Sequence, residues 1–373
     1  MIGISNVCYH KLCYITLHKL HPLTQDRKHD ETTLPLRIRM TMKQIIISIL
    51  ITVTVSFSNP GYTAPLAGCQ ILPANNIWNT PVDTLPVAAN SALMINNMGK
   101  NTSLHPDFGS GTWAGAKIGI PITIVNSNQA LVSVDFTYSD ESNPGPYPIP
   151  PNAAIEGEPN DGDRHVLVLN QGDCKLYEMF YSWQQSDDSW EAGSGAIFDL
   201  TSNALRPDTW TSADAAGLPI LPGLIRYEEA ASGTIDHAIR FTVNESRNTH
   251  IWPARHNASN LSGNQYPPMG QRFRLKASVD ISGFSPINQA ILQAMKTYGM
   301  IIADNGSDWF ISGEPSENWD NVDLRELGNI KGSDFEAIDI SSLMVAPDSG
   351  EVLPQKQDKT QTLSWMHLLL KNN

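Results

Sequence analysis

Cysteine is scarce in this chain, and the signatures of several large enzyme classes are missing. Only 4 of the 373 residues are cysteines. Gly193-Ser194-Gly195 lacks the Gly-x-Ser-x-Gly pattern of a nucleophile elbow, and neither a Walker loop nor a His-Glu-x-x-His motif occurs. Trp252-Pro253 lies between His250 and His256 and disrupts any regular metal-ligand spacing. These absences disfavour a serine hydrolase, a nucleotide-dependent enzyme and a zinc protease, and they predict neither metal nor cofactor.

Basic residues and long apolar runs are also few. The chain has 25 Lys and Arg against 38 Asp and Glu. Its main apolar stretch, residues 45–57, follows the positive charge of Lys43; it has the length of a signal-peptide core and is too short to span a bilayer. We therefore predict a signal peptide at residues 40–64, no membrane span, and export to the periplasm or the medium. Residues 1–39 show no sustained period and are interpreted as a leader or a misassigned start.

The mature part is strongly acidic. Removal of residues 1–64 leaves 18 basic and 35 acidic residues, a net charge of −17. This charge repels nucleic acid and anionic membranes, so we expect a soluble monomer with no nucleic-acid partner. No low-complexity linker divides residues 65–347, which predicts one domain, followed by a disordered polar tail at residues 348–373.

Two cysteines remain after export, Cys69 and Cys174. In an oxidising compartment they predict one disulfide, although two free thiols are the alternative. Leu66-Ala67-Gly68-Cys69 resembles a bacterial lipobox, but about ten polar or turn-forming residues separate it from the apolar core. We therefore favour a disulfide over a lipid anchor at Cys69.

Short segments rich in Val, Ile, Phe and Tyr predict a mainly β fold, a sandwich or a jelly-roll-like domain. We expect strands at residues 118–125, 131–137, 165–169, 176–183, 235–243 and 272–276. A minor helical part centres on residues 286–298, where Ser285 is the expected N-cap and Gly299 ends the helix. Asn305-Gly306 predicts a hairpin between residues 300–304 and 307–312.

Several segments resemble a group of secreted bacterial proteins for which no activity is known to us. The segments are Leu72 to Thr80, Gly162 to Val168, Cys174 to Glu178, Ala216 to Leu224, Trp252 to His256 and Tyr298 to Gly306. The resemblance covers most of the mature domain. It implies export and a shared β-rich fold, and it assigns no catalytic residue.

A cationic stripe marks the strand expected at residues 272–276. Arg272, Arg274 and Lys276 alternate with Phe273 and Leu275, so the cations should share one face. An exposed stripe of this kind could bind a carboxylated or sulfated polymer, because Arg binds carboxylates in bidentate fashion. A solvated face paired with Asp and Glu is the alternative.

Histidine and arginine also gather near the expected strand ends. Arg164-His165, Arg240 and Arg255-His256 could converge on one concavity of a sheet, where the imidazoles would act as bases. The alternative is that these imidazoles are core residues with satisfied hydrogen bonds. Trp252 is an expected substrate-binding residue beside them.

Glu178 lies between Leu176 and Phe180 on one strand face, a setting that should raise its pKa and suit a general acid. Asp163, Glu156 and Asp107 are candidate second carboxylates for a glycosidase pair. The alternative for Glu178 is an ion pair with a strand arginine.

These features favour a secreted carbohydrate-active protein that acts on an acidic polysaccharide, with lyase chemistry as the leading hypothesis. Arginine would neutralise the uronate, and His or Tyr would remove the C5 proton. Tryptophan rings could stack on sugars; the candidates are Trp78, Trp113, Trp183, Trp190, Trp210 and Trp252. A glycoside hydrolase and a non-catalytic glycan-binding module of the envelope or matrix are the alternatives.

Overall fold

Short hydrophobic strands organise the part of the chain that the structure describes. The computed structural model describes residues 64–354. Within this range 15 strands in four sheets accompany four α-helices. The prediction of a mainly β fold with a minor helical part is therefore confirmed at this level, and the sandwich or jelly-roll arrangement stays a prediction. The predicted leader, nearly all of the predicted signal peptide and most of the predicted tail lie outside the described residues.

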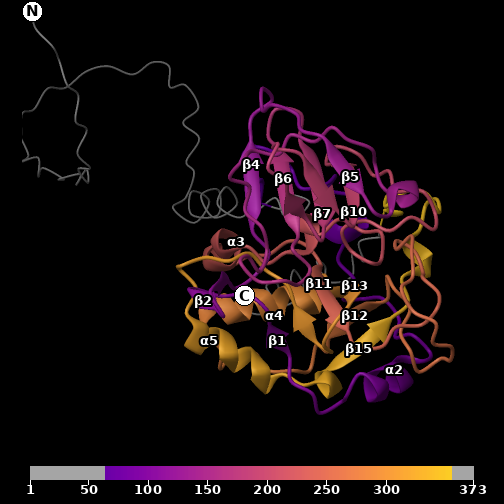
Figure 1. Cartoon of the computed structure of the whole chain (residues 1–373). Coiled ribbons are helices and arrows are strands. Elements are labelled where there is room, and N and C mark those ends of the chain that lie inside the picture. Colours follow the sequence, from indigo (N-terminus) through magenta and orange to yellow (C-terminus); the bar gives the residue numbers. More distant parts are fainter. Residues whose placement is uncertain (1–63, 355–373) are drawn as a thin grey trace, which may run out of the picture. The chain divides into compact units, whose positions relative to one another are not determined.

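Two of the sheets occupy the upper part of the described fold in Figure 1. The four-stranded sheet has the order β10 (Ser194–Asp199), β7 (Lys175–Phe180), β6 (Val166–Asn170) and β4 (Ile122–Val125). Strand β6 pairs parallel with β4 and antiparallel with β7. The three-stranded sheet contains β5 (Val134–Phe136), β9 (Trp190–Ala192) and β8 (Trp183–Gln184).

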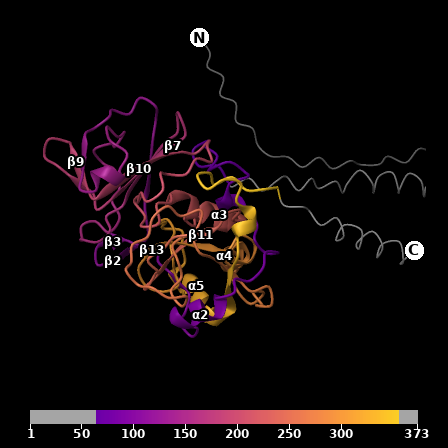
Figure 2. The same ribbon diagram turned by 90° about the vertical axis from the view of Figure 1, so that its right-hand side faces the viewer.

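A six-stranded mixed sheet lies below them (Figure 1). Its order is β1 (His105–Pro106), β14 (Phe310–Ile311), β11 (Ile239–Val243), β13 (Met300–Asn305), β12 (Arg272–Leu275) and β15 (Phe335–Ile338). The α-helices are α2 (Ser91–Asn97), α3 (Tyr227–Ser232), α4 (Pro286–Thr297) and α5 (Asn321–Arg325). Figure 2 shows α2 and α5 at the lower end of the described fold, opposite the end that holds β9 and β10. A separate hairpin joins β2 (Thr112–Trp113) to β3 (Ala116–Lys117).

Strand β6 is buried on both faces because it lies between two hydrophobic cores. Leu167 and Leu169 belong to the large core that includes the six-stranded sheet. Val166 and Val168 point the other way, into a smaller core shared with the three-stranded sheet. Side chains alternate along a strand, so His165, just before β6, shares the face of Leu167 toward the large core, as the sequence predicts.

Helix α4 matches its prediction closely. The Ser285 hydroxyl accepts the backbone N–H of Asn288 at 3.2 Å, and Pro286 occupies the first turn. Gly299 follows the helix with φ +71°, the left-handed conformation expected after a helix C-terminus. Ile291 and Met295 are fully buried in the large core, which anchors the helix against the sheet.

The predicted hairpin at Asn305-Gly306 is wrong. Strands β13 and β14 do not pair with each other, because β11 lies between them. Phe241 of β11 is opposite Ile311 of β14 and, on the other side, opposite Ile302 of β13. The tight-turn signal is local. Strand β11 lies about sixty residues earlier in the chain, and it pairs with both β13 and β14 in place of their pairing with each other.

The exposed cationic stripe is also a wrong prediction. Arg272 is fully buried and donates to three backbone carbonyls: Tyr298 (2.7 Å), Ile77 (2.8 Å) and Thr80 (3.2 Å). Burial lowers its pKa to about 9. The N-terminal segment at residues 77–80 covers the face that the alternating pattern leaves open.

The guanidinium of Arg274 is likewise occupied by contacts within the protein. Its guanidinium pairs with Glu336 of β15 at 2.8 Å and donates to the carbonyl of Val82, also at 2.8 Å. Arg272 and Arg274 therefore hold the N-terminal segment against the sheet, and neither has a free guanidinium for a substrate.

Residues 348–354 are part of the fold, whereas the sequence places them in a polar tail. The backbone N–H of Ile77 donates to Gly350 at 2.8 Å, and that of Val352 donates to Asn75 at 3.0 Å. The polar composition misleads here because backbone groups make these contacts. In residues 64–354 no helix has the length and apolar character needed to cross a membrane.

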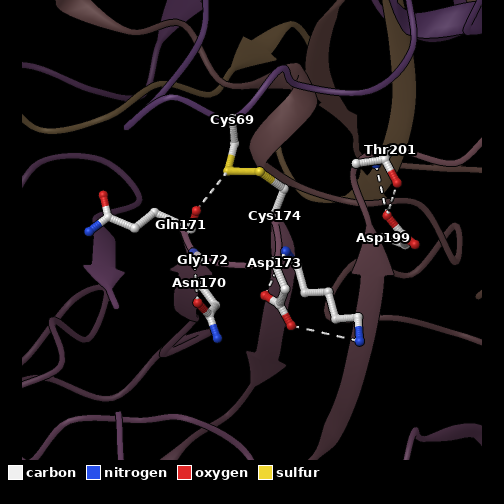
Figure 3. The surroundings of a disulfide bond; sticks show 9 residues. Cys69, Asn170, Gln171, Gly172, Asp173, Cys174, Asp199 and Thr201 are labelled. Carbon is white, nitrogen blue, oxygen red and sulfur yellow. Dashed lines mark hydrogen bonds and ion pairs between the residues drawn. A yellow bond between two sulfur atoms is a disulfide. The ribbon is translucent and has the colours of Figure 1, made fainter. Parts of the chain in front are cut away.

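The predicted disulfide is confirmed. Cys69 and Cys174 are bridged with their Cα atoms 5.5 Å apart, and the bond ties the N-terminal segment to the turn before β7 (Figure 3). Their separation of 105 residues makes this a long covalent loop. In the chain-entropy model a loop of this length raises the free energy of unfolding by about 4 kcal/mol.

Replacing both Cys69 and Cys174 with Ser should lower the free energy of unfolding by about 4 kcal/mol, because the unfolded chain regains loop entropy. Urea denaturation of the mature domain would measure the change. The single variant Cys174→Ser is the matched control and should lose nearly the same amount. A loss below about 1 kcal/mol would show that the bridge does not form in solution.

Arg272→Met should lower the free energy of unfolding by about 2–4 kcal/mol, because three buried carbonyls lose their donor. Chemical denaturation gives the difference. Lys276→Met, at the end of the same strand, is the control and should change stability by less than about 1 kcal/mol. Equal effects of the two substitutions would restore the exposed-stripe hypothesis.

Candidate functional site

A cavity of about 370 Å³ lies where the end of β7 and the start of β10 meet the C-terminal end of β13. We call it the acidic pocket. It is lined by Tyr138, Glu141, Asp163, Phe180, Ser194, Thr211, Ser212, Ala213, Asp214, Ala215, His256, Ala258, Asp304 and Asn305. Four of these residues are carboxylates and none is Lys or Arg, so the lining is predominantly negative.

The loop at residues 211–215 forms one wall and is held rigidly. The Ser212 hydroxyl donates to the carbonyl of Leu218 at 2.6 Å and accepts the backbone N–H of Asp214 at 2.9 Å. Ser194 of β10 donates to the Ser212 carbonyl at 2.6 Å. The loop therefore presents Asp214 and its neighbours in a fixed geometry.

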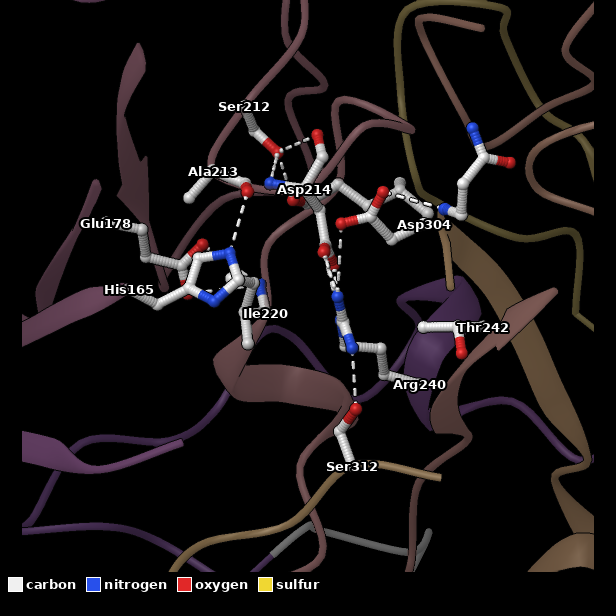
Figure 4. Close-up of polar contacts among 12 residues, drawn as sticks. His165, Glu178, Ser212, Ala213, Asp214, Ile220, Arg240, Thr242, Asp304 and Ser312 are labelled. Atoms are coloured by element: carbon white, nitrogen blue, oxygen red, sulfur yellow. Dashed lines mark hydrogen bonds and ion pairs between the residues drawn. The ribbon is translucent and has the colours of Figure 1, made fainter. Parts of the chain in front are cut away.

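A buried ion pair lies behind this wall (Figure 4). Arg240 of β11 makes bidentate contact with Asp214 and donates to the Ser312 hydroxyl at 2.6 Å. Asp214 raises the pKa of Arg240 despite its burial, so the guanidinium stays charged. This arrangement satisfies Arg240 within the protein and leaves it no direct contact with a ligand in the pocket.

Asp304, at the C-terminal end of β13, is the most perturbed carboxyl in the acidic pocket. Burial and the neighbouring negative charge of Asp214 raise its pKa to about 7, although Arg240, 3.5 Å away, opposes the shift. Its side chain keeps 19% of its exposure. Asp304 can therefore exchange a proton with a bound molecule near neutral pH.

His256 lines the pocket with one ring nitrogen available. Its Nδ1 lies 2.8 Å from the carbonyl of Ala215, which only accepts, so this nitrogen carries a proton. Its Nε2 lies 3.9 Å from the Glu141 carboxylate, with which it forms an ion pair when the ring is protonated, and it is an acceptor when the ring is neutral. Of the imidazoles predicted as bases, His256 is the one that the structure places in the pocket lining.

His165 is fully buried behind the pocket and faces acceptors on both sides. Its Nδ1 contacts the Glu156 carboxylate, and its Nε2 lies 3.1 Å from the carbonyl of Ala213. Two acceptors require two ring protons, so the ring is an imidazolium. Burial opposes that charge, but Glu156 outweighs it and raises the pKa of His165 to about 9. His165 is therefore a positioning group and has no access to a substrate.

Glu178 does not reach a cavity. It is fully buried and accepts the backbone N–H groups of Ile220 and Leu221, each at 2.9 Å, at the start of the 3₁₀ helix Leu221–Gly223. Burial raises its pKa to about 7, as the sequence predicts. Its partners are backbone amides and not the arginine of the alternative interpretation, and they give it a structural role in place of the predicted catalytic one.

Three other predicted site residues make their polar contacts with groups of the protein itself. Arg164 donates to the carbonyl of Ser182 at 3.0 Å and stacks over the Trp183 ring at 3.8 Å. Arg255 pairs with Asp348 at 2.6 Å. The Trp252 indole donates to the carbonyl of Ser349 at 2.8 Å.

The predicted convergence is thus partly realised. His256 lines the acidic pocket, and Arg240 and His165 lie behind its wall. Arg164, Arg255, Glu178, Arg272, Arg274 and Trp252 contribute no lining group. Asp304 and Asp214 were not predicted, although Asp304 comes directly after the apolar run Met300 to Ala303, at the C-terminal end of β13.

Three separate segments of the chain meet at the pocket. They contribute Asp163, His256 and Asp304, which are far apart in the sequence. Within residues 64–354 no group of three or more His, Cys, Asp or Glu side chains is placed to hold a metal ion. Comparison of the chain with protein-family models, curated proteins and solved structures found no match.

Proposed function

We propose that this protein is a secreted glycoside hydrolase in which Asp304 is the general acid. The observation that carries the proposal is a carboxyl with a pKa of about 7 that keeps partial exposure to a pocket. Glycosidases need one protonated carboxyl to donate to the leaving oxygen at near-neutral pH. Asp304 has this property.

Asp163 is the proposed second carboxylate. It is exposed, lines the same pocket, and its charge contributes to the raised pKa of Asp304. A solvated carboxylate beside a desolvated carboxyl is the division of roles that hydrolysis requires. His256 Nε2 and the Thr211 and Tyr138 hydroxyls would orient sugar hydroxyl groups.

A neutral glycan fits this pocket better than an acidic one. The prediction of an acidic polysaccharide depends on free arginines, and Arg255, Arg272 and Arg274 all donate to groups of the protein itself. The pocket lining carries carboxylates and no Lys or Arg. Such a surface repels a polyanion.

Lyase chemistry is a second candidate because His256 Nε2 is an acceptor in the pocket. An unprotonated imidazole could remove the C5 proton of a uronate. A lyase leaves an unsaturated product that absorbs in the ultraviolet, whereas a hydrolase yields only new reducing ends. A glycan-binding module would yield neither.

Export is part of the proposal. The signal peptide lies almost entirely outside the described residues, and support comes from the disulfide between Cys69 and Cys174. Disulfides persist mainly in oxidising compartments such as the periplasm and the extracellular medium.

Asp304→Asn should reduce kcat by about 10²–10⁴-fold, because the amide cannot donate the proton to the leaving group. Release of reducing ends from a panel of xylan, β-glucan, mannan, polygalacturonate and alginate would measure it, with absorbance of unsaturated products read in parallel. Asp188→Asn, in the exposed loop between β8 and β9, is the matched control and should keep full activity. Full activity in Asp304→Asn would rule out its role as the acid.

The pH dependence provides an independent test of Asp304. Wild-type activity should fall as the pH rises through about 7, since the acid loses its proton. Folding raises this pKa from 3.8, so the folded state binds the proton more tightly than the unfolded state. The contribution of Asp304 to the free energy of unfolding should therefore decrease between about pH 4 and pH 7. Urea denaturation across this range should show a weaker decrease in Asp304→Asn than in the wild type.

A further inference from the structure

A second, larger cavity of about 840 Å³ lies beside the β2–β3 hairpin. We call it the tryptophan groove and define it by His105, Asp107, Trp113, Lys117, Glu156 and Arg325, which line it. Its volume lies within the range of small-molecule sites. The proposed chemistry at Asp304 uses none of these residues.

Trp113 stands at the edge of this groove with 80% of its surface exposed. It is opposite Ala116 in a hairpin whose two turn residues, Ala114 and Gly115, have φ +51° and +89°. Positive φ at both positions is the signature of a type I′ turn, whose twist matches that of the strands. Asn160 fixes the turn further by donating to the Ala114 carbonyl at 3.0 Å. The indole is therefore exposed to solvent, and the hairpin fixes the position of its backbone.

Unpaired polar groups line the same groove as the indole. In residues 64–354 no hydrogen bond or ion pair reaches the side chains of Asp107, Lys117 or Arg325. His105 is exposed and stacks on Phe310 with ring centroids 4.0 Å apart. Desolvation by the surrounding walls raises the pKa of Asp107. Free donors and acceptors around a flat apolar ring match a sugar, which has an apolar face and a rim of hydroxyl groups.

The tryptophan groove is linked to the acidic pocket through two side chains in contact, Glu156 and His165. Glu156 lines the groove and contacts His165, whose other nitrogen bonds to Ala213 in the wall of the acidic pocket. The charge of Asp163 in the acidic pocket also raises the pKa of Asp107 in the groove. The two cavities are therefore separated by adjoining side chains, Glu156 and His165, and influence each other electrostatically.

A protein partner fits the groove less well. Stable protein interfaces bury about 800 Å² per partner around an apolar centre from which charged residues are depleted. The groove lining includes apolar residues such as Phe108, Ile118 and Phe310, but it also carries four charged side chains, those of Asp107, Lys117, Glu156 and Arg325.

We propose that the tryptophan groove binds a neutral glycan chain by stacking one sugar on Trp113. This inference rests on the proposed function for the identity of the polymer, but binding in the groove requires no turnover. It assigns the groove to substrate binding and the acidic pocket to bond cleavage.

The test measures binding separately from catalysis. Isothermal titration calorimetry with xylan, β-glucan and mannan fragments would use the mature protein carrying Asp304→Asn, so that no fragment is consumed. At least one fragment should bind. Adding Trp113→Ala should weaken that binding about tenfold or more, whereas Trp113→Phe should keep most of it. Leu131→Ala, which removes another exposed hydrophobe outside both cavities, is the matched control and should have no effect.

The outcomes separate the two proposals. Binding that depends on Trp113, without turnover by the wild type, would support the groove and overturn the hydrolase. Turnover and binding that are both insensitive to Trp113→Ala would overturn the groove and leave the hydrolase standing. No binding of any fragment, or concentration-dependent self-association that Trp113→Ala abolishes, would also overturn the groove.

Discussion

The buried ion pair between Arg240 and Asp214 is the interaction on which the candidate site depends. Arg240 comes from the middle of the six-stranded sheet, and Asp214 comes from a loop that is hydrogen-bonded to β10 in the four-stranded sheet. The pair therefore joins the two sheets at the point where the acidic pocket opens. A buried charge without a partner costs several kcal/mol, so neither residue can be lost without exposing the other to that cost. The raised pKa of Asp304 follows from the same arrangement, because Asp214 lies close enough to disfavour a second negative charge.

Local signals in the sequence were sufficient for the features that depend on local physics. The caps of α4 and its apolar stripe involve residues within one or two turns, and the structure has the helix where they place it. The disulfide was predictable because only two cysteines lie beyond the predicted signal peptide. The alternation of side chains along a strand also predicted that His165 shares a face with Leu167.

The features that failed depend on segments distant in sequence. Alternation in β12 separates Arg272 from Phe273, but it cannot show that residues 77–80 will cover the arginine face. The Asn305-Gly306 signal could not anticipate the insertion of β11 between its flanking strands. The acidic pocket combines Asp163, His256 and Asp304 from three parts of the chain, so no spacing rule finds it. Asp163 and His256 could be named as candidates, whereas their common cavity could not.

The contacts between the two ends of the described fold have a consequence for its assembly. Asn76 pairs with Glu351, and Arg272 binds carbonyls that precede it by almost two hundred residues. A nascent chain cannot make these contacts until its last segments have emerged from the ribosome. During synthesis the N-terminal segment therefore lacks its contacts with Arg272 and Glu351. High separation between contacting residues slows folding, because loop entropy is lost before the contacts compensate for it. We therefore expect this domain to fold slowly and after translation, with exposed strand edges that a chaperone would protect.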